Sequence, residues 1–425
     1  MNKQYLPGVI VLTLLGAALL SACSGNGGVA QAQALPATLP ATLTDAIPTS
    51  LPTLFPTPTA AIFEWEPTST SIATFTSIPA FTQVPTPVAH ESIGPQDFPA
   101  GVDPLTGLVV SDPQLLERRP VAVKVTNFPR AVRPQWGLTQ ADQVYEYYLE
   151  DLITRFIGVF YGQNPTRVGP VRSGRFFDEH IVRMYKSFFV FGWADDRVVD
   201  PWTESDLKNF LVVERGDNCP PMCRIGPKWG YNTLYADLPA LETDVTSKEI
   251  NNERQDLNGF QFDTVPPFSP KDVWQVYVRY SAISYNRWDY DPLSGRYKRY
   301  QEAGDAWQVE DESYRPLSDS GTGQQIAADN LVVLLIPHEY FMNTKTTEMV
   351  KMNFIGEGVA YVFRDGKIYP TEWTRTKPEE LVKLIYPDGK PFPLKPGQTW
   401  FEVIGESSAV KQQADGAWRF EFAIP

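Results

Sequence analysis

The order of apolar and polar positions divides the chain into four parts. An apolar run from Leu6 to Leu20 is followed by a stretch rich in Pro, Thr, Ala and Ser up to residue 100. After Gly101, short apolar runs with the alternation of strands are mixed with one run of helical spacing. From about Val265 onward, the runs have the period of strands. This pattern predicts a leader, a polar tether and two folded domains.

The first folded part, residues 101–262, is predicted to mix helix and strand. Apolar side chains at Ile181, Met184, Tyr185 and Phe188 recur with helical spacing, which predicts a helix over residues 176–189. Runs rich in Val, Ile, Phe and Tyr indicate the strands. These span residues 121–125, 143–150, 154–161 and 189–193.

The second folded part, residues 263–425, is predicted to be rich in strands. The sequences Asp291–Gly295 and Arg364–Lys367 have the residues of tight turns, and the second contains Asp-Gly, which is typical of a two-residue hairpin. The predicted strands span residues 277–285, 297–301, 331–336, 359–364, 368–373 and 399–404. The fold class predicted for the whole chain is α+β.

The N-terminal leader, residues 1–22, has the features of a lipoprotein signal peptide. Lys3 precedes the apolar run, and Leu20-Ser21-Ala22 then leads into Cys23. Small residues suit the peptidase site, and the thiol of Cys23 accepts the lipid. A transmembrane helix is disfavoured because the apolar run is shorter than the ~20 residues that a span needs. We expect an exported protein anchored at Cys23 by acyl chains such as palmitate.

Residues 23–100 are predicted to be a disordered tether. The stretch from Gln31 to Pro99 is dominated by Pro, Thr, Ala and Ser, and no Lys or Arg occurs between Lys3 and Arg118. Such a segment buries too little apolar surface to offset the cost of ordering. As a coil it spans ~50 Å, and as polyproline II over ~200 Å. It would hold the folded domains away from a membrane, on its extracytoplasmic face.

Composition narrows the classes of partner. A formal net charge of −13 over 425 residues argues against general binding to nucleic acid.

Besides Cys23, the cysteines are Cys219 and Cys223, and in an exported protein this pair most simply forms a disulfide. A zinc site would need two more ligands, and the three histidines are scattered. We therefore expect no metal and no cofactor.

A series of short motifs carries a family resemblance. In the first part these are Val121–Asn127, Arg133–Leu138, Ala141–Glu146, Ile153–Phe156 and Val168–Arg175, and in the second Trp288–Asp291, Tyr297–Arg299, Asp329–Val333 and Leu394–Trp400. The series resembles that of the YerB-like lipoproteins, the DUF3048 family, across residues 101–405. The resemblance implies a lipid-anchored extracytoplasmic protein. It also implies an N-terminal domain packed as a layered α/β sandwich, followed by a β-rich domain.

The resemblance does not supply an activity, because the family is one of unknown function. The chain also departs from its pattern at one point. Relatives often have Pro-His-Asn where this chain has Gly230-Tyr231-Asn232, and the Cys219/Cys223 pair is inserted upstream. A functional histidine at that position is therefore not expected here.

The loop Gly169–Arg175 is the leading candidate for ligand binding. It lies between a predicted strand and a predicted helix, where free backbone N–H groups and a positive helix end attract anions. Arg172 and Arg175 match carboxylate or phosphate oxygens. The alternative is a structural network in which they pair with Glu146 or Asp142. The further candidate anion ligands are Lys124, Asn127, Arg133, Arg155 and Ser173.

Two other groups of residues suggest different chemistry. Glu146 and Asp142 are candidates for general acid and base. Paired carboxylates are common in acidic proteins, however, and Ser173 has no histidine partner that the sequence identifies. A set of aromatic side chains predicts either a carbohydrate platform or an aromatic core. These are Trp193, Trp202, Trp229, Tyr231 and Tyr235.

The sequence favours a binding or scaffold lipoprotein of the cell envelope over two alternatives. In the favoured hypothesis the first domain recognises an anionic or glycan ligand, and Cys23 attaches the protein to the cell membrane, or to an outer membrane if the cell has one. The first alternative is a hydrolase or lyase that acts on an envelope polymer. The second is a protein-interaction lipoprotein whose motifs are purely structural.

Overall fold

The computed structural model describes residues 92–216, 218–226, 230–269, 271–413 and 416–425. The predicted signal peptide, Cys23 and most of the predicted tether lie outside these residues. Within them, the predicted α+β class is confirmed, because three α-helices accompany many more strands. The helices are α1 (Phe176–Tyr185), α2 (Asp196–Thr203) and α3 (Leu238–Ser247), and short 3-10 helices span Pro113–Glu117, Arg130–Val132, Leu138–Gln140, Asp206–Phe210 and Val309–Asp311.

The larger sheet contains ten strands among the described residues, in the order β19-β18-β17-β14-β21-β2-β3-β1-β4-β5. The five strands from the first half of the chain are β1 (Val121–Thr126), β2 (Gln143–Tyr148), β3 (Thr154–Phe160), β4 (Phe188–Phe191) and β5 (Leu211–Val213). The five from the second half are β14 (Asn330–Ile336), β17 (Gly356–Arg364), β18 (Lys367–Arg375), β19 (Lys383–Ile385) and β21 (Thr399–Gly405).

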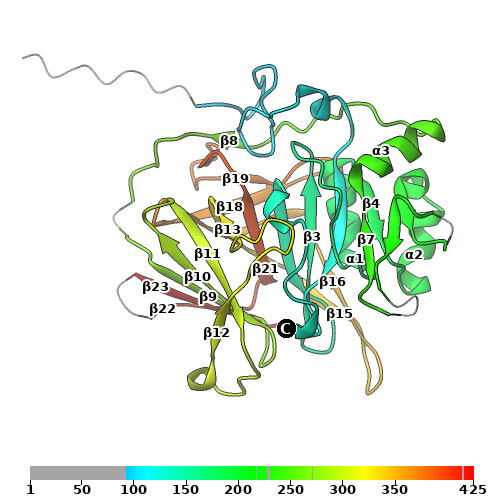
Figure 1. The fold of residues 1–425 in the computed structure, drawn as a ribbon. Helices are drawn as coiled ribbons and strands as arrows, with labels where there is room; N and C mark the ends of the chain where they lie inside the picture. Colours follow the sequence, from blue (N-terminus) through cyan, green and yellow to red (C-terminus); the bar gives the residue numbers. More distant parts are fainter. Residues whose placement is uncertain (1–91, 217, 227–229, 270, 414–415) are drawn as a thin grey trace, which may run out of the picture. The chain divides into compact units, whose positions relative to one another are not determined.

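This sheet runs across the boundary that we predict between the two domains. Strand β21, drawn in red in Figure 1, pairs in parallel with β2 on one side and with β14 on the other. All seven residues of β21 and all six of β2 are buried. Both faces of the sheet are covered at this point, so even the polar residues of these strands, Glu146 and Glu402 among them, are buried. The division at residues 262 and 263 remains a prediction.

A second sheet of seven strands lies within the described part of the second half. Its order is β12-β11-β10-β9-β23-β22, with β13 beside β11. The strands are β9 (Gln275–Arg279), β10 (Tyr285–Asp291), β11 (Arg296–Glu302), β12 (Tyr314–Pro316), β13 (Ala327–Ala328), β22 (Ala409–Gln412) and β23 (Ala417–Glu421). Short two-stranded pairs join β6 (Met222–Arg224) to β7 (Leu234–Ala236), β8 (Gln261–Phe262) to β20 (Pro393–Leu394), and β15 (His338–Asn343) to β16 (Glu348–Met352).

The helices and the second sheet cover opposite faces of β2. Successive side chains of a strand point to opposite faces. Tyr147 of β2 packs on Phe177 of α1, with ring centroids 4.7 Å apart. Its neighbour Glu146 instead meets Arg299 of β11 in the second sheet. The result is a layer of helix, a layer formed by the large sheet and a layer formed by the second sheet.

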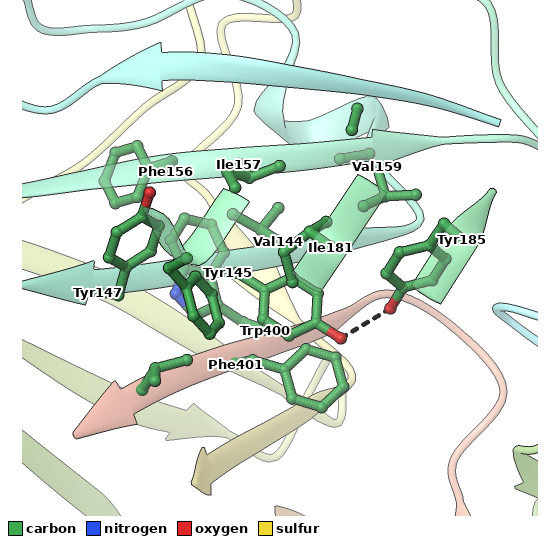
Figure 2. Close-up of a cluster of buried hydrophobic side chains, with 14 of the residues drawn as sticks. Val144, Tyr145, Tyr147, Phe156, Ile157, Val159, Ile181, Tyr185, Trp400 and Phe401 are labelled. Atoms are coloured by element: carbon green, nitrogen blue, oxygen red, sulfur yellow. Dashed lines mark hydrogen bonds between the residues drawn. The ribbon is translucent and has the colours of Figure 1, made fainter. Parts of the chain in front are cut away.

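A cluster of aromatic side chains holds α1 to the large sheet. Figure 2 shows Tyr145 of β2 directed at Tyr185 of α1, and their hydroxyl oxygens lie 2.7 Å apart. Phe401 of β21 stacks on Tyr145 with ring centroids 4.4 Å apart. Three separate elements therefore meet at one tyrosine ring.

The structure adds elements that the sequence did not indicate, among them α2, α3 and the hairpin β15–β16, and it alters three predicted segments. The predicted helix over residues 176–189 ends at Tyr185, because Lys186 has a left-handed backbone with φ 50° and β4 follows. The predicted strand over residues 277–285 is interrupted by a turn in which Ser281 Oγ accepts hydrogen bonds from the amides of Ile283 and Ser284. Residues 92–100, assigned to the tether, include Ile93, whose amide donates to the carbonyl of Phe262 at 2.8 Å.

A buried ion network joins the two sheets. Arg299 is fully buried, and its guanidinium contacts Glu146 Oε2 at 2.6 Å and Glu402 Oε1 at 3.1 Å. Glu146 and Glu402 lie opposite each other on β2 and β21. Burial, reinforced by the charge of Glu146, raises the pKa of Glu402 to about 7. The ring of Trp400 lies 4.7 Å from the guanidinium of Arg299 and covers it.

We expect Arg299→Met to lower the free energy of unfolding by about 3–5 kcal/mol, because it leaves two buried carboxylates without their cation. Urea denaturation would measure this loss. The matched control is Arg287→Met on β10, where a partly exposed arginine pairs with Asp289 at 2.7 Å. We expect the control to lose about 1 kcal/mol or less. Equal losses in the two variants would show that the network contributes no more than a surface pair.

Candidate anion-binding site

The loop Gly169–Arg175 is fixed by backbone hydrogen bonds to two neighbouring strands. The carbonyl of Pro170 accepts from the amide of Thr126, and the amide of Arg172 donates to the carbonyl of Lys124. On the other side, the amide of Gly174 donates to the carbonyl of Trp193 just after β4, at 2.7 Å. The loop therefore has a defined position between the ends of β1 and β4, and it leads directly into α1.

Arg175 caps the start of α1 and is neutralised by one carboxylate. Its amide donates to Asp178 Oδ2 at 2.7 Å, which satisfies a free N–H at the helix end. Its guanidinium pairs with Glu150, with Nε donating to Oε2 at 2.7 Å. Arg175 therefore belongs to a structural pair, as one of the two interpretations of this loop predicts, but its partner is Glu150.

Two other arginines at the loop have no such partner. Arg155 of β3 is 5% exposed, and its Nη1 donates to the backbone carbonyl of Ser173 at 2.8 Å. Half-buried Arg172 donates from Nη1 to the carbonyl of Tyr231 at 3.1 Å, and its buried Nε has no hydrogen-bond partner. Neither guanidinium forms an ion pair with a carboxylate among the residues that the structure describes.

The pKa values of both arginines are lowered. Burial and the neighbouring charge of Arg175 together lower the pKa of Arg155 to about 9, although Glu150 opposes the shift. The pKa of Arg172 is lowered by the same two causes, and Glu150 again opposes them. The single charge of Glu150 therefore compensates both arginines only in part, and a bound anion would stabilise them.

Lys124 lies behind the loop and is fully buried. Its Nζ contacts Asp178 Oδ1 at 2.9 Å and the hydroxyl of Tyr147. Burial lowers the pKa of Lys124 to about 7, although Asp178 opposes this shift. A ligand outside the protein does not reach this ammonium directly. Its role is to hold Asp178 at the start of α1 and to add positive charge behind the loop.

The charges around the loop do not balance. Four basic side chains gather there, and two carboxylates accompany them. The basic residues are Lys124, Arg155, Arg172 and Arg175, and the acidic residues are Glu150 and Asp178. The excess is two positive charges when Lys124 is protonated and one when it is not, so the arrangement suits a mono- or dianion.

One exposed aromatic ring borders Arg172, and a second lies elsewhere on the surface. Tyr231 is 82% exposed, and its ring centroid lies 5.9 Å from the guanidinium of Arg172. Trp193 is 50% exposed and follows the strand that holds the loop. Trp202 instead packs in the core against Phe191, so the aromatic set predicted from sequence is divided between surface and core. Tyr235 is partly buried, and Trp229 lies outside the described residues.

The remaining candidate residues belong to other clusters. Arg133 pairs with Glu302 at 2.6 Å, and its Nε donates to Asn127. Asn127 Nδ2 in turn donates to Glu146 Oε1 at 3.2 Å. Arg133, Asn127 and Glu146 therefore belong to the network between the sheets. Asp142 accepts hydrogen bonds from the amides after β3, and burial raises its pKa to about 6. Neither Glu146 nor Asp142 pairs with Arg172 or Arg175 among the described contacts.

Some members of the cluster were not identified from sequence. Asp178 occupies the third position of α1, where a carboxylate caps the amide of Arg175, and this spacing is a recognisable helix-start signal. Tyr147 alternates with Glu146 on β2, but nothing in the sequence shows that its hydroxyl meets Lys124 and Asp178. Arg299 and Glu402 come from distant segments, and no local pattern connects them to Glu146.

The predicted disulfide between Cys219 and Cys223 is present. It closes the segment that enters β6, and β6 pairs with β7 to form the hairpin beside Tyr231. In the described part of the chain, no group of three or more His, Cys, Asp or Glu side chains is placed to hold a metal ion. Within the same residues, no helix is long and apolar enough to cross a membrane.

We expect the stability of the protein to rise from about pH 7 to pH 9 through Lys124. In that window the unfolded chain keeps the lysine protonated and the folded chain does not, because the folded pKa is lowered to about 7. The unfolded state then binds more protons, so the free energy of unfolding increases with pH. Lys124→Met removes this contribution. Urea denaturation at several pH values would measure it.

The control for this prediction is Lys345→Met, which changes an exposed lysine in the turn between β15 and β16. The difference in unfolding free energy between wild type and Lys124→Met should grow with pH by up to about 1.4 kcal/mol per unit. The difference between wild type and the control should stay constant. A constant difference for Lys124→Met as well would contradict the prediction.

Comparison with known proteins agrees with the family resemblance. The model described as "Protein of unknown function (DUF3048) N-terminal domain" matches residues 105–251, and the corresponding C-terminal domain model matches residues 276–401. A protein of Bacillus subtilis (strain 168) named "Putative lipoprotein YerB" is 27% identical over 322 residues, which are 72% of this chain and 87% of that protein.

A solved structure is also similar. The crystal structure of the YerB protein from Bacillus subtilis aligns with a TM-score of 0.58 and 25% sequence identity, covering 71% of this chain and 96% of that chain. Both domain models occur here in order, and the similarity to YerB extends over nearly all of its solved chain. The chain therefore belongs to the DUF3048 family of YerB-like proteins.

Proposed function

We propose that the protein is a lipid-anchored, extracytoplasmic binding protein of the cell envelope whose first domain recognises an anionic ligand. The observation that carries this proposal is the pair of arginines, Arg155 and Arg172, that have no carboxylate partner among the described residues. A partly buried cation without a counter-charge costs free energy, and a bound anion recovers it. The similarity to a protein named as a lipoprotein supports the anchoring.

The ligand proposed for this site combines an acidic group with a sugar. Arg172 offers guanidinium hydrogen bonds that match carboxylate or phosphate oxygens. The exposed ring of Tyr231 borders Arg172, and flat rings pack against the apolar faces of sugars. An anionic envelope glycan carries both features.

Binding is favoured over hydrolysis by the positions of the candidate acids. Glu146 is 1% exposed and already contacts Arg299, Asn127 and Thr154. Asp142 is 5% exposed and holds backbone amides. A general acid or base must come within hydrogen-bond reach of the substrate. Neither carboxylate is placed at the surface beside the loop.

We expect Arg172→Gln to weaken binding of an acidic sugar by about tenfold or more, because a hydrogen bond to a charged group contributes about 1.5–3 kcal/mol. Glucuronic acid and inorganic phosphate would be titrated against the purified full chain by calorimetry at about 0.15 M salt, where weak surface attraction is screened. Arg315→Gln is the matched control, because Arg315 is exposed on β12 of the other sheet.

Unchanged affinity in Arg172→Gln would reject the site. Equal weakening in Arg172→Gln and Arg315→Gln would show that binding depends only on the net charge of the protein, and this result would also reject the site. No binding of either ligand by a folded wild type would favour the protein-interaction alternative.

We expect Cys23→Ser to abolish lipid attachment and to move the protein from the membrane fraction to the soluble fraction. The sequence around Cys23 motivates this expectation, and the residue itself lies outside the described part of the chain. Labelling cells with an alkyne fatty acid, followed by fractionation, would measure both effects. Cys219→Ser is the control, because that sulfur forms a disulfide and should not affect labelling. Labelling that survives in Cys23→Ser would contradict the assignment.

A further inference from the structure

A large cleft separates the helices of the first half of the chain from the hairpin β15–β16 of the second half. Its volume is about 800 Å³, within the size range of ligand sites. One wall is α2 with Arg197 and Pro201, and the other is the hairpin with Glu339 and Phe341. The cleft does not include Arg155 or Arg172, so it is separate from the anion site proposed above.

The floor of the cleft is rigid because His180 ties three elements together. Its Nε2 lies 3.0 Å from the carbonyl of Met352 on β16, and its Nδ1 lies 3.2 Å from Arg375 Nη1 on β18. Arginine only donates, so Nδ1 is the acceptor and Nε2 carries the proton. Burial and the charge of Arg375 lower the pKa of His180 to about 4, which keeps this neutral arrangement at physiological pH.

A second histidine, His338, borders the cleft, but its ring is buried against Phe422. His338 is 5% exposed, and its Nδ1 lies 2.7 Å from the carbonyl of Ile336, so Nδ1 carries the proton. Its Nε2 is then a hydrogen-bond acceptor, and it has no partner among the described residues. Burial lowers the pKa of His338 to about 4, so this nitrogen remains unprotonated. Because Nε2 is buried, a ligand in the cleft does not reach it, and His338 serves to hold the start of β15.

Lys351 on β16 provides a cation on the hairpin wall. Its ammonium lies 4.2 Å from the ring centroid of Phe341 and 4.9 Å from that of Phe176. It forms no ion pair with any carboxylate that the structure describes, although Glu339 lies opposite it across the hairpin. The two rings fix the ammonium beside an apolar surface, where it is only partly hydrated.

We infer that this cleft binds the carboxyl terminus of a peptide that ends in an apolar side chain. Lys351 would hold the terminal carboxylate, and the surface formed by Phe176, Phe341 and Pro201 would contact the side chain. Glu339 would accept hydrogen bonds from peptide N–H groups. A ligand of this class supplies a negative charge, N–H donors and an apolar group together, and the cleft presents a partner for each.

Other ligand classes fit the cleft less well. A fatty acid would supply the carboxylate and the apolar chain, but it has no donor for Glu339. A sugar would supply donors, but it packs on free ring faces, and the ammonium of Lys351 already lies over both phenylalanine rings. The peptide terminus is the class that leaves neither Lys351 nor Glu339 unpaired.

Calorimetric titration with three short peptides would test this inference. The probes are acetyl-Gly-Gly-Phe with a free carboxylate, the same peptide as its carboxamide, and acetyl-Gly-Gly-Gly with a free carboxylate. The purified full chain is expected to bind the first about tenfold or more tightly than the other two, because each lacks one of the two recognised groups. Lys351→Gln should remove the preference for carboxylate over carboxamide.

Matched control variants distinguish a loss of carboxylate recognition by Lys351 from misfolding and from a change in net charge. Lys345→Gln changes an exposed lysine in the turn of the same hairpin and should leave all three affinities unchanged. Arg172→Gln should also leave them unchanged, so that a failure of the proposed anion site does not affect this test. Equal binding of carboxylate and carboxamide, equal losses in Lys351→Gln and Lys345→Gln, or no binding by wild type at millimolar peptide would each overturn the inference.

Discussion

The structure depends on one buried cation between two carboxylates. Arg299 on β11 contacts Glu146 on β2 and Glu402 on β21, and these strands come from three distant parts of the chain. A charge in an apolar interior is costly unless it is paired with good geometry, so the three groups require each other. The two sheets and the two halves of the chain are thereby fixed in a single arrangement. That arrangement positions the loop before α1 and the cleft beside the hairpin β15–β16.

The loop and the cleft share an arrangement of charge. In each, a basic side chain lies beside aromatic rings and has no carboxylate partner among the described residues: Arg172 beside Tyr231, and Lys351 between Phe176 and Phe341. Other basic groups in the interior have their hydrogen bonds supplied by the protein: Arg299 and Lys124 contact carboxylates, and Arg375 donates to backbone carbonyls. Arg172 and Lys351 are instead placed beside exposed or cleft surface, where a ligand can reach them. We propose that both serve an envelope protein that binds acidic ligands.

Local patterns predicted much of the fold. The alternation in 154–161 and the Asp-Gly turn at residues 365 and 366 depend on neighbouring residues, and the structure has β3 and the β17–β18 hairpin at these positions. The loop Gly169–Arg175 was recognised because its glycines and arginines are adjacent in sequence. The partners of its arginines could not be predicted in the same way. Glu150, the partner of Arg175, lies 25 residues before it in the sequence. Arg133, which the sequence predicts as an anion ligand together with the loop, pairs with Glu302 instead.

The sequence by itself determined the α+β class, the start of α1, the short disulfide and the family, because each depends on residues that are close along the chain or on motifs that can be read in order. Only the tertiary structure decided which charges are compensated. The pairing of β2 with β21 places Glu146 beside Glu402, 256 residues apart, and makes both of them partners of Arg299 instead of the loop arginines. Whether a charged side chain is structural or free to bind depends on the distance to its counter-charge, and only the packed chain sets that distance.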